Sequence, residues 1–345
     1  MDTYTLAAIA ILGLLIYLQQ TALKTYVKLQ TNISSEILDY LKKNKLKSLL
    51  EFLIVIASLL CLFGGHFNEW IPLFAVAFAL FSLWALSRLY WMESNPSNLL
   101  KGYEKEAFQA IAKVNESELC KWVEAIHEVA FKALTSSSMP IATAALNSEL
   151  SVGKQFLVQP NTLDLPKIGY VLFFIFERLN TLFEKGLANK QESFCTQVNT
   201  TFGKLALQAM STHPHFAGYA LNFAGKLAEK AVKAGMKEIG IKTSFMLLEV
   251  TKSVVNEVSL DDYDLRESLV LLVKNLEEIS KEIYRQDKNT PLDSLKEPLL
   301  QLKTILAGSK NSAHPTILLA INEVDRVLAE FQELELILKT LPPIS

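Results

Sequence analysis

Three apolar stretches without a single charged residue lie in the first quarter of the chain and limit its fold more than any other feature. They are Leu6–Leu18, Phe52–Gly65 and Trp70–Leu86. A helix needs about 20 apolar residues to cross the roughly 30 Å hydrocarbon layer of a membrane. The sequence therefore predicts an all-α protein with three transmembrane helices followed by a multi-helical domain.

Aromatic residues flank the third stretch on both sides. Trp70 begins it, Trp84, Tyr90 and Trp91 lie toward its far end, and Arg88 stands among them. Tryptophan and tyrosine gather where a membrane meets water, and an arginine there can extend its charged head to the lipid headgroups. We expect these five residues to lie at the two membrane interfaces.

The first stretch is the shortest of the three and leaves alternatives open. It could be a retained span, a cleaved secretory signal, or a segment that lies in the interface. No Lys or Arg precedes Lys24, and no small-residue cleavage site follows the stretch. A signal peptide normally has both features, so the sequence favours a retained span.

Lysines between the first two spans predict the orientation of the chain. Against Glu36 and Asp39, this segment carries six of them: Lys24, Lys28, Lys42, Lys43, Lys45 and Lys47. Short loops rich in Lys and Arg stay on the cytoplasmic side, and such a loop can also attract anionic lipid. The turn at residues 66–69 has neither Lys nor Arg and is expected outside.

The predicted organisation follows from these signals. Residues 1–23 form the first span, 24–48 a basic cytoplasmic loop, 49–92 a transmembrane hairpin, and 98–345 a cytoplasmic helical domain. We see no organelle or secretory signal and therefore expect a bacterial inner membrane. Glycosylation motifs fall on the expected cytoplasmic side and should stay unmodified, at Asn32, Asn115 and Asn199.

Composition excludes several classes of function. The net charge of −2 argues against a nucleic-acid-binding protein, which usually has a strong basic excess. The three cysteines have the spacing of neither a disulfide framework nor a zinc site: Cys61, Cys120 and Cys195.

Helical spacing of apolar residues dominates the chain after Asn98. It predicts ten helices, at 98–114, 116–135, 139–157, 164–186, 190–212, 214–234, 236–258, 262–287, 291–308 and 314–341. Taken in pairs, they repeat at about 40 to 50 residues, as in helical-pair solenoids. Without a repeated sequence signature, a closed helical bundle stays nearly as plausible.

Particular residues predict where several of these helices begin and end. Asn115 and Asp261 are expected to cap helix starts, and Gly235 and Gly308 to adopt the left-handed conformation that ends a helix. Pro298 falls inside a predicted helix, where it is expected to kink or shorten it.

Residues 168–176, IGYVLFFIF, form the most apolar run outside the predicted spans. Glu177 and Arg178 follow directly, so the run is too short to cross a membrane. An all-round apolar helix segment normally lies in a core. Contact with a membrane surface or a second subunit is the alternative.

Residues that could carry metal chemistry have simpler explanations. His213 and His215 lack a third ligand nearby in the sequence, so we interpret them as residues of a loop before a helix. Glu124 and His127 resemble part of a zinc-protease motif, but Phe131 stands where the second histidine belongs. We expect these two to be a pair on a helix surface.

Three further patterns are also weak. Gly225-Lys226 lacks the spacing and the Ser or Thr of a phosphate loop. The cluster Asp261, Asp262 and Asp264 lacks the glycine and terminal glutamate of a calcium loop, so helix capping explains it better. The serines at 136–138, with Asn147 beyond them, have only His127 as a distant base and are expected to form a turn.

The favoured interpretation is a membrane-anchored scaffold or adaptor that binds a protein partner, or a second copy of itself, on the cytoplasmic side. We predict no catalytic, metal or cofactor site, no small-molecule substrate and no nucleic acid. The alternative is an oligomeric pore or the regulatory subunit of a transporter. An enzyme would become plausible if His127 or His213 were buried and faced a polar pocket.

Overall fold

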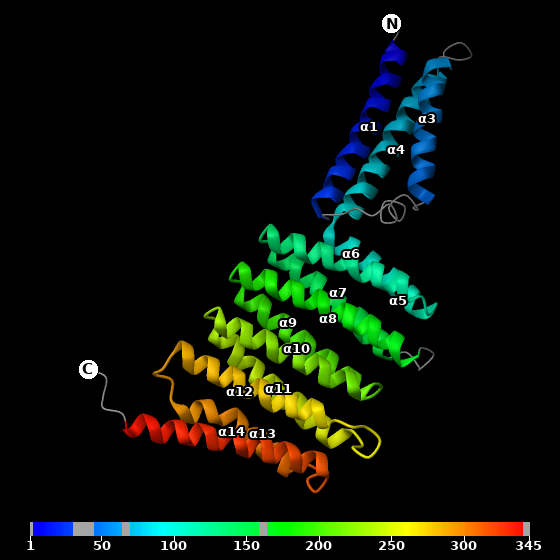
Figure 1. Cartoon of the computed structure of the whole chain (residues 1–345). Coiled ribbons are helices and arrows are strands. Elements are labelled where there is room, and N and C mark those ends of the chain that lie inside the picture. The colour runs from blue at the N-terminus through cyan, green and yellow to red at the C-terminus, as the bar shows by residue number, and fades with distance from the viewer. Residues whose placement is uncertain (1–2, 30–44, 64–69, 159–163, 341–345) are drawn as a thin grey trace.

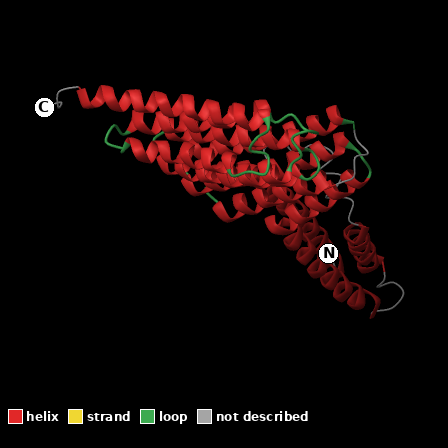
Figure 2. Cartoon of the chain, turned by 90° about the horizontal axis from the view of Figure 1, so that it is seen from below, coloured by secondary structure: helices red, strands yellow, loops and turns green. Residues whose placement is uncertain are grey.

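The protein is helical in every part of the chain that the structure describes. The computed structural model describes residues 3–29, 45–63, 70–158 and 164–340, and these contain thirteen helices and no strand (Figures 1 and 2). The helices are α1 (Thr3–Leu29), α3 (Lys45–Phe63), α4 (Trp70–Ser94), α5 (Pro96–Ala112), α6 (Glu116–Thr135), α7 (Met139–Val158), α8 (Leu165–Ala188), α9 (Glu192–Met210), α10 (Pro214–Lys233), α11 (Lys237–Glu257), α12 (Arg266–Gln286), α13 (Leu292–Ala307) and α14 (Pro315–Thr340). The predicted all-α class is therefore confirmed.

The first three helices hold the three predicted apolar stretches. Thr3–Thr21, Leu46–Phe63 and Trp70–Tyr90 are each long and apolar enough to cross a membrane. The helices contact one another, and small side chains such as Ala57 and Ala79 are buried between them. Parts of the predicted basic loop, residues 24–48, are helical, because α1 continues to Leu29 and α3 begins at Lys45, while residues 30–44 lie outside the described residues.

The remaining ten helices form an open stack of two layers. Each of them contacts the next helix along the chain and the one after that, so odd-numbered helices pack side by side in one layer and even-numbered helices in the other. Figure 1 shows this stack, with the three apolar helices rising from it in a different direction. Helix α4 contacts α5, and α1 contacts α6, so the apolar helices pack against the first pair.

This arrangement agrees with the solenoid-like alternative of the prediction. Helix pairs begin at Pro96, Met139, Glu192, Lys237 and Leu292. The distance along the sequence from one pair's first residue to the next is longer than the predicted 40 to 50 residues in two cases, because longer connections precede α8 and α12. Phenylalanine rings fill the space between the layers. The ring centroids of Phe176 of α8, Phe202 of α9 and Phe223 of α10 lie 5.6 to 5.7 Å from one another.

The same backbone turn occurs at four of the connections in the stack, after α5, α6, α8 and α10. The amide of Asn115 donates to the carbonyl of Ala110, and the residue between the helices, Val114, has a φ of +56°. Ser137, Lys190 and Gly235 occupy the matching position after α6, α8 and α10, with φ of +58°, +55° and +86°. This is the Schellman helix ending, in which a left-handed residue allows two backbone bonds to close the helix.

Some predicted helix ends are confirmed and others are wrong. The side chain of Asn115 accepts a hydrogen bond from the Glu118 amide, and Gly235 is left-handed, as predicted. Gly308 has a φ of −86°, so its helix ends without a left-handed residue. Helix α12 begins at Arg266, too late for Asp261 to cap it, and the Arg266 amide donates to Asp264 instead.

Helix α13 runs through Pro298 without ending there. A proline cannot donate a backbone hydrogen bond to the carbonyl four residues earlier, here that of Ser294. The hydroxyl of Ser280 on α12 donates to the next carbonyl, that of Leu295, at 3.0 Å. A neighbouring helix thus supplies a donor where the proline weakens the helix's own bonding.

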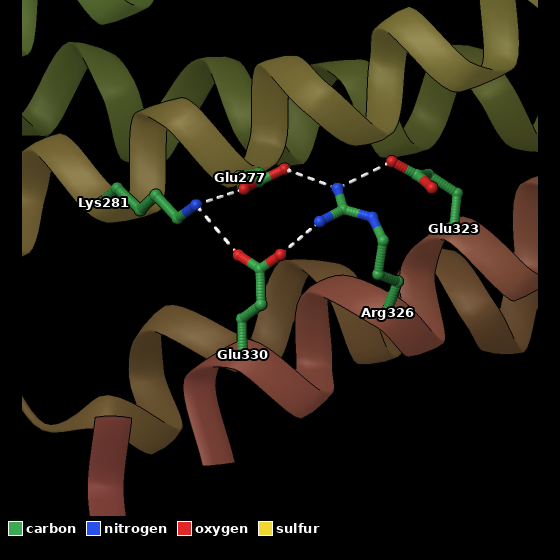
Figure 3. A network of polar contacts seen from close by, with 5 residues as sticks. All are labelled: Glu277, Lys281, Glu323, Arg326 and Glu330. Atoms are coloured by element: carbon green, nitrogen blue, oxygen red, sulfur yellow. Dashed lines mark hydrogen bonds and ion pairs between the residues drawn. The ribbon is translucent and has the colours of Figure 1, made fainter. Parts of the chain in front are cut away.

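Charged side chains hold the last helix onto the stack. Arg326 of α14 bonds Glu277 of α12 at 3.3 Å and Glu323 at 2.7 Å (Figure 3). It also contacts Glu330, which accepts from Lys281 of α12 at 3.1 Å, and Lys281 in turn contacts Glu277. The five residues alternate in charge, so each cation lies between carboxylates.

Candidate binding groove

The apolar run at residues 168–176 lies in α8 and is divided between the core and the surface. Val171, Leu172, Ile175 and Phe176 are buried, as predicted. Tyr170 is 60 % exposed and Phe173 is 37 % exposed, so the predicted core position is wrong for these two. The reason is that α8 packs within one layer of a two-layer stack, which leaves part of its surface uncovered.

Helix α10 places two more aromatic rings beside these. Phe216 and Tyr219 are three residues apart and therefore point to the same side of the helix. The Phe173 ring lies 5.2 Å from that of Tyr219 and 6.4 Å from that of Phe216, both edge-to-face. This is the favoured geometry of aromatic pairs, and it orders exposed rings that would otherwise be free to rotate.

These rings line an open groove that extends across α8, α10 and α12. Its volume is about 560 Å³, within the range of roughly 300 to 1,000 Å³ typical of ligand sites. Its wall on α12 is formed by Glu267, Ser268 and Leu271. Gly218 lies against this wall, and a Cβ atom there would come within 1.9 Å of the Ser268 hydroxyl, so glycine permits the close approach of α10 and α12.

A smaller hollow of about 310 Å³ adjoins the groove and shares Phe216 and His215 with it. Its polar lining includes Thr212 and His213. Burial lowers the pKa of His213, so its imidazole is neutral near pH 7. The Thr212 hydroxyl is buried and makes no hydrogen bond within the described residues. The two hollows therefore offer hydrogen-bonding groups next to an aromatic surface.

The charged residues that line the two hollows are acidic. Asp264 and Glu267 line the groove, and neither hollow has a lysine or arginine among its described lining residues. Asp264 lies 3.6 Å from the Nε of Arg266, which partly offsets its charge. Glu267 is exposed in the first turn of α12, where a carboxylate also favours the helix start.

A second polar cluster is buried between α6, α7 and α8. His127 is 5 % exposed, its Nδ1 lies 3.6 Å from Glu149, and its Nε2 lies 3.3 Å from the Thr181 hydroxyl. The expected surface pair of Glu124 and His127 is therefore wrong. Glu124 contacts Arg178 of α8 at 2.5 Å instead, while His127 lies between Glu149 of α7 and Thr181 of α8.

Glu149 is fully buried, and neither of its carboxylate oxygens makes a hydrogen bond. Burial raises its pKa, because the charged form loses its hydration, while His127 acts in the opposite direction. Neither His127 nor Glu149 lines the groove or the smaller hollow. His213, in contrast, is buried and lines the smaller hollow. The hollow is not the polar pocket that would make catalysis plausible, because Leu165, Ile168 and Phe216 form much of its lining.

Other residues singled out in the sequence have structural roles. Gly225 is buried against α12, where a Cβ atom would come within 2.6 Å of Asn275. Ser137 is the left-handed residue of the turn between α6 and α7. In the described residues no group of three or more His, Cys, Asp or Glu could hold a metal ion. Burial raises the pKa of two cysteines outside the apolar helices, Cys120 to about 11 and Cys195 to about 12.

The residues expected at the membrane interfaces fall into two groups. Trp70 and Trp84 are exposed, and the Arg88 guanidinium lies 5.6 Å from the Trp84 ring. Tyr90 is buried, its hydroxyl donates to Glu51 at 2.7 Å, and the Lys47 ammonium lies 4.0 Å from its ring. Trp91 belongs to α4, Lys24 and Lys28 to α1, and Lys45 to α3, while Lys42 and Lys43 lie outside the described residues.

Sequence reasoning missed the groove itself. Tyr219 and Glu267 belong to helices that looked ordinary, and the aromatic pairs at i and i+3 on α8 and α10 were the available signal. That signal becomes informative once α8 and α10 are known to be neighbours in one layer.

Comparison with known proteins identifies no family. No family model matches the chain, and no curated protein matches it. A solved structure described as a circular tandem repeat protein with novel repeat topology and enhanced subunit contact surfaces aligns with 86 % of this chain and 75 % of its own, at 14 % identity and a TM-score of 0.38. A similarity at this level carries no argument. The open stack is defined by the helix contacts within this chain.

Proposed function

We propose that the protein is a multi-pass membrane-anchored scaffold whose helical stack binds a protein partner on the cytoplasmic side. The groove across α8, α10 and α12 carries this proposal, because exposed aromatic rings beside hydrogen-bonding groups are typical of protein-binding surfaces. Helix stacks of this kind also offer long surfaces for partners. Binding does not need a catalytic residue.

The apolar helices support the anchoring part of the proposal. Their outward side chains include Phe74, Phe81 and Leu6, each more than half exposed. Large apolar side chains exposed together on neighbouring helices are costly in water and favourable in lipid. The lysines between the first two apolar helices favour the cytoplasm for the stack, and a bacterial inner membrane is the proposed location.

A crosslinking experiment in native membranes tests the scaffold. Epitope-tagged full-length chain and a chain truncated after Asn98 are expressed, treated with a lysine-reactive crosslinker and purified in mild detergent. The proposal expects a specific protein that crosslinks to the full chain and is lost on truncation. If only self-crosslinks form, and they form equally in both chains, the scaffold proposal fails and assembly through the apolar helices replaces it.

A further inference from the structure

We infer that the groove across α8, α10 and α12 recognises an arginine or lysine side chain within an apolar segment of a partner protein. This inference rests on the proposed scaffold function and adds the chemistry of its partner. Three features of the groove support it: the aromatic rings on one wall, the unpaired carboxylate on the other, and the absence of basic residues from the described lining.

The aromatic wall suits a cation as well as an apolar side chain. Tyr170, Phe173 and Tyr219 are exposed, and Phe173 and Tyr219 stand edge-to-face at 5.2 Å. The faces of such rings are negative, and an arginine or lysine head within about 6 Å of a ring centre is attracted to them. Arginine is favoured over lysine, because its flat guanidinium stacks on rings and is more weakly hydrated.

The opposite wall supplies the matching charge. Glu267 lines the groove, is exposed, and makes no ion pair among the described residues. Asp264 adds a second carboxylate, although Arg266 lies 3.6 Å from it. A cationic side chain in the groove would therefore contact rings on α8 and α10 and a carboxylate on α12, three helices that the stack holds together.

Nearby hydrogen-bonding groups add to the same preference. The Thr212 hydroxyl is buried without a partner, and the neutral imidazole of His213 can accept a hydrogen bond. A guanidinium has five donors and no acceptor, so its chemistry complements acceptors of this kind. An anionic membrane surface would be repelled by Glu267 and Asp264, so this face is assigned to a protein segment.

The test places a photo-crosslinking phenylalanine analogue in the full-length protein in its native membrane. One variant carries it at Tyr170 in the groove. A control carries it at Phe245 of α11, which is also exposed but lies in the other layer. After irradiation, the crosslinked peptides are identified by mass spectrometry, so the sequence next to the groove is determined directly.

The inference expects Tyr170 to crosslink to a segment of another protein that contains an arginine or lysine close to the crosslinked residue. The charge reversal Glu267→Lys should lower this yield about tenfold, as expected when an ion pair and a cation–π contact are lost together. Glu267→Gln should have a smaller effect. Glu249→Lys, an exposed carboxylate on α11, should leave the yield unchanged.

Other outcomes separate this inference from the proposed function. If Tyr170 captures a partner whose segment lacks an arginine or lysine, the scaffold stands and cation recognition is overturned. The same holds if Glu267→Lys leaves the crosslinking yield unchanged. Crosslinks to lipid or to a second copy of the chain overturn it as well. If the Phe245 position captures a partner and the groove does not, binding occurs elsewhere on the stack. If neither position captures a protein, both proposals fail.

Discussion

Glu149 shows how a single residue makes the stability of this fold depend on pH. Its carboxyl group is fully buried beside His127, and burial raises its pKa above the ordinary value of 4.5. Below about pH 4.5 the carboxyl is protonated in both the folded and the unfolded chain. As the pH rises through the folded-state pKa, the buried group must ionise, and this contribution to stability is lost.

We therefore expect Glu149→Gln to raise the free energy of unfolding at pH 8 by on the order of 1 kcal/mol, a common size for a single substitution, because the glutamine amide has no charge that burial penalises. Near pH 4.5 the variant and the parent should unfold at similar temperatures. Thermal unfolding in detergent, followed by circular dichroism at both pH values, measures this. Glu249→Gln, at an exposed position, is the control. A variant that is equally or less stable at pH 8 would contradict the prediction.

Two glycines of the groove offer a matched comparison. A Cβ atom at Gly218 would lie 1.9 Å from the Ser268 hydroxyl and 2.5 Å from its Cβ, whereas one at Gly169 would meet only Phe216, at an ordinary 3.5 Å. We expect Gly218→Ala to destabilise the fold by about 1–3 kcal/mol, the usual cost of overpacking. Gly169→Ala should be neutral or slightly stabilising, since alanine favours helices.

Chemical denaturation of the two glycine variants measures this difference. A second control replaces the obstructing residue. Ser268→Gly combined with Gly218→Ala should recover part of the loss, because both clashing atoms are removed. Equal stability of Gly218→Ala and Gly169→Ala would show that α10 and α12 can separate without cost.

At the scale of helices, the sequence predicted the elements well but not the backbone turn that recurs between them. The starts and ends of the ten helices of the stack were mostly predictable, because apolar spacing, Asn115 and the prolines near helix starts act locally. The repeated Schellman turn was not, since a different residue stands at its left-handed position each time. The backbone repeats there although the side chains do not.

Val114 is the costliest of these residues, since β-branched side chains are the least suited to a positive φ. We expect Val114→Gly to stabilise the fold by roughly 0.5–1 kcal/mol, because relief of the left-handed conformation exceeds the entropy that glycine adds to the unfolded chain. Lys113→Gly is the control, because its φ of −87° needs no glycine and the change should destabilise. Thermal unfolding of both variants tests the sign of each effect.

The groove belongs to the same scale and explains why the site was harder to predict than the fold. Tyr170 and Phe173 come together with Tyr219 and Glu267 through packing of α8, α10 and α12 within one layer. Local sequence patterns determine each helix but not which helices become neighbours. The buried pair of His127 and Glu149 was missed for the same reason, since its members lie on different helices.

At the scale of the whole molecule, the orientation in the membrane is the central prediction. A single cysteine introduced by Asn68→Cys, in the segment between the second and third apolar helices, should react with a membrane-impermeant maleimide in intact cells. Ser312→Cys, between α13 and α14, should react only after the membrane is opened. The native cysteines are buried and should give little background. The reverse labelling pattern would place the stack outside.

The open stack also determines how the protein would respond to mechanical tension. Each pair of helices is supported by its neighbours in the stack, and the first pair is in addition held by α1 and α4. A pull on the C-terminal end would therefore load the ion pairs of Arg326 and Lys281 first and then separate the helix pairs in order toward α5. The groove has one wall on α12, so it would keep its shape only until α13 and α14 had separated and the pull reached α11 and α12.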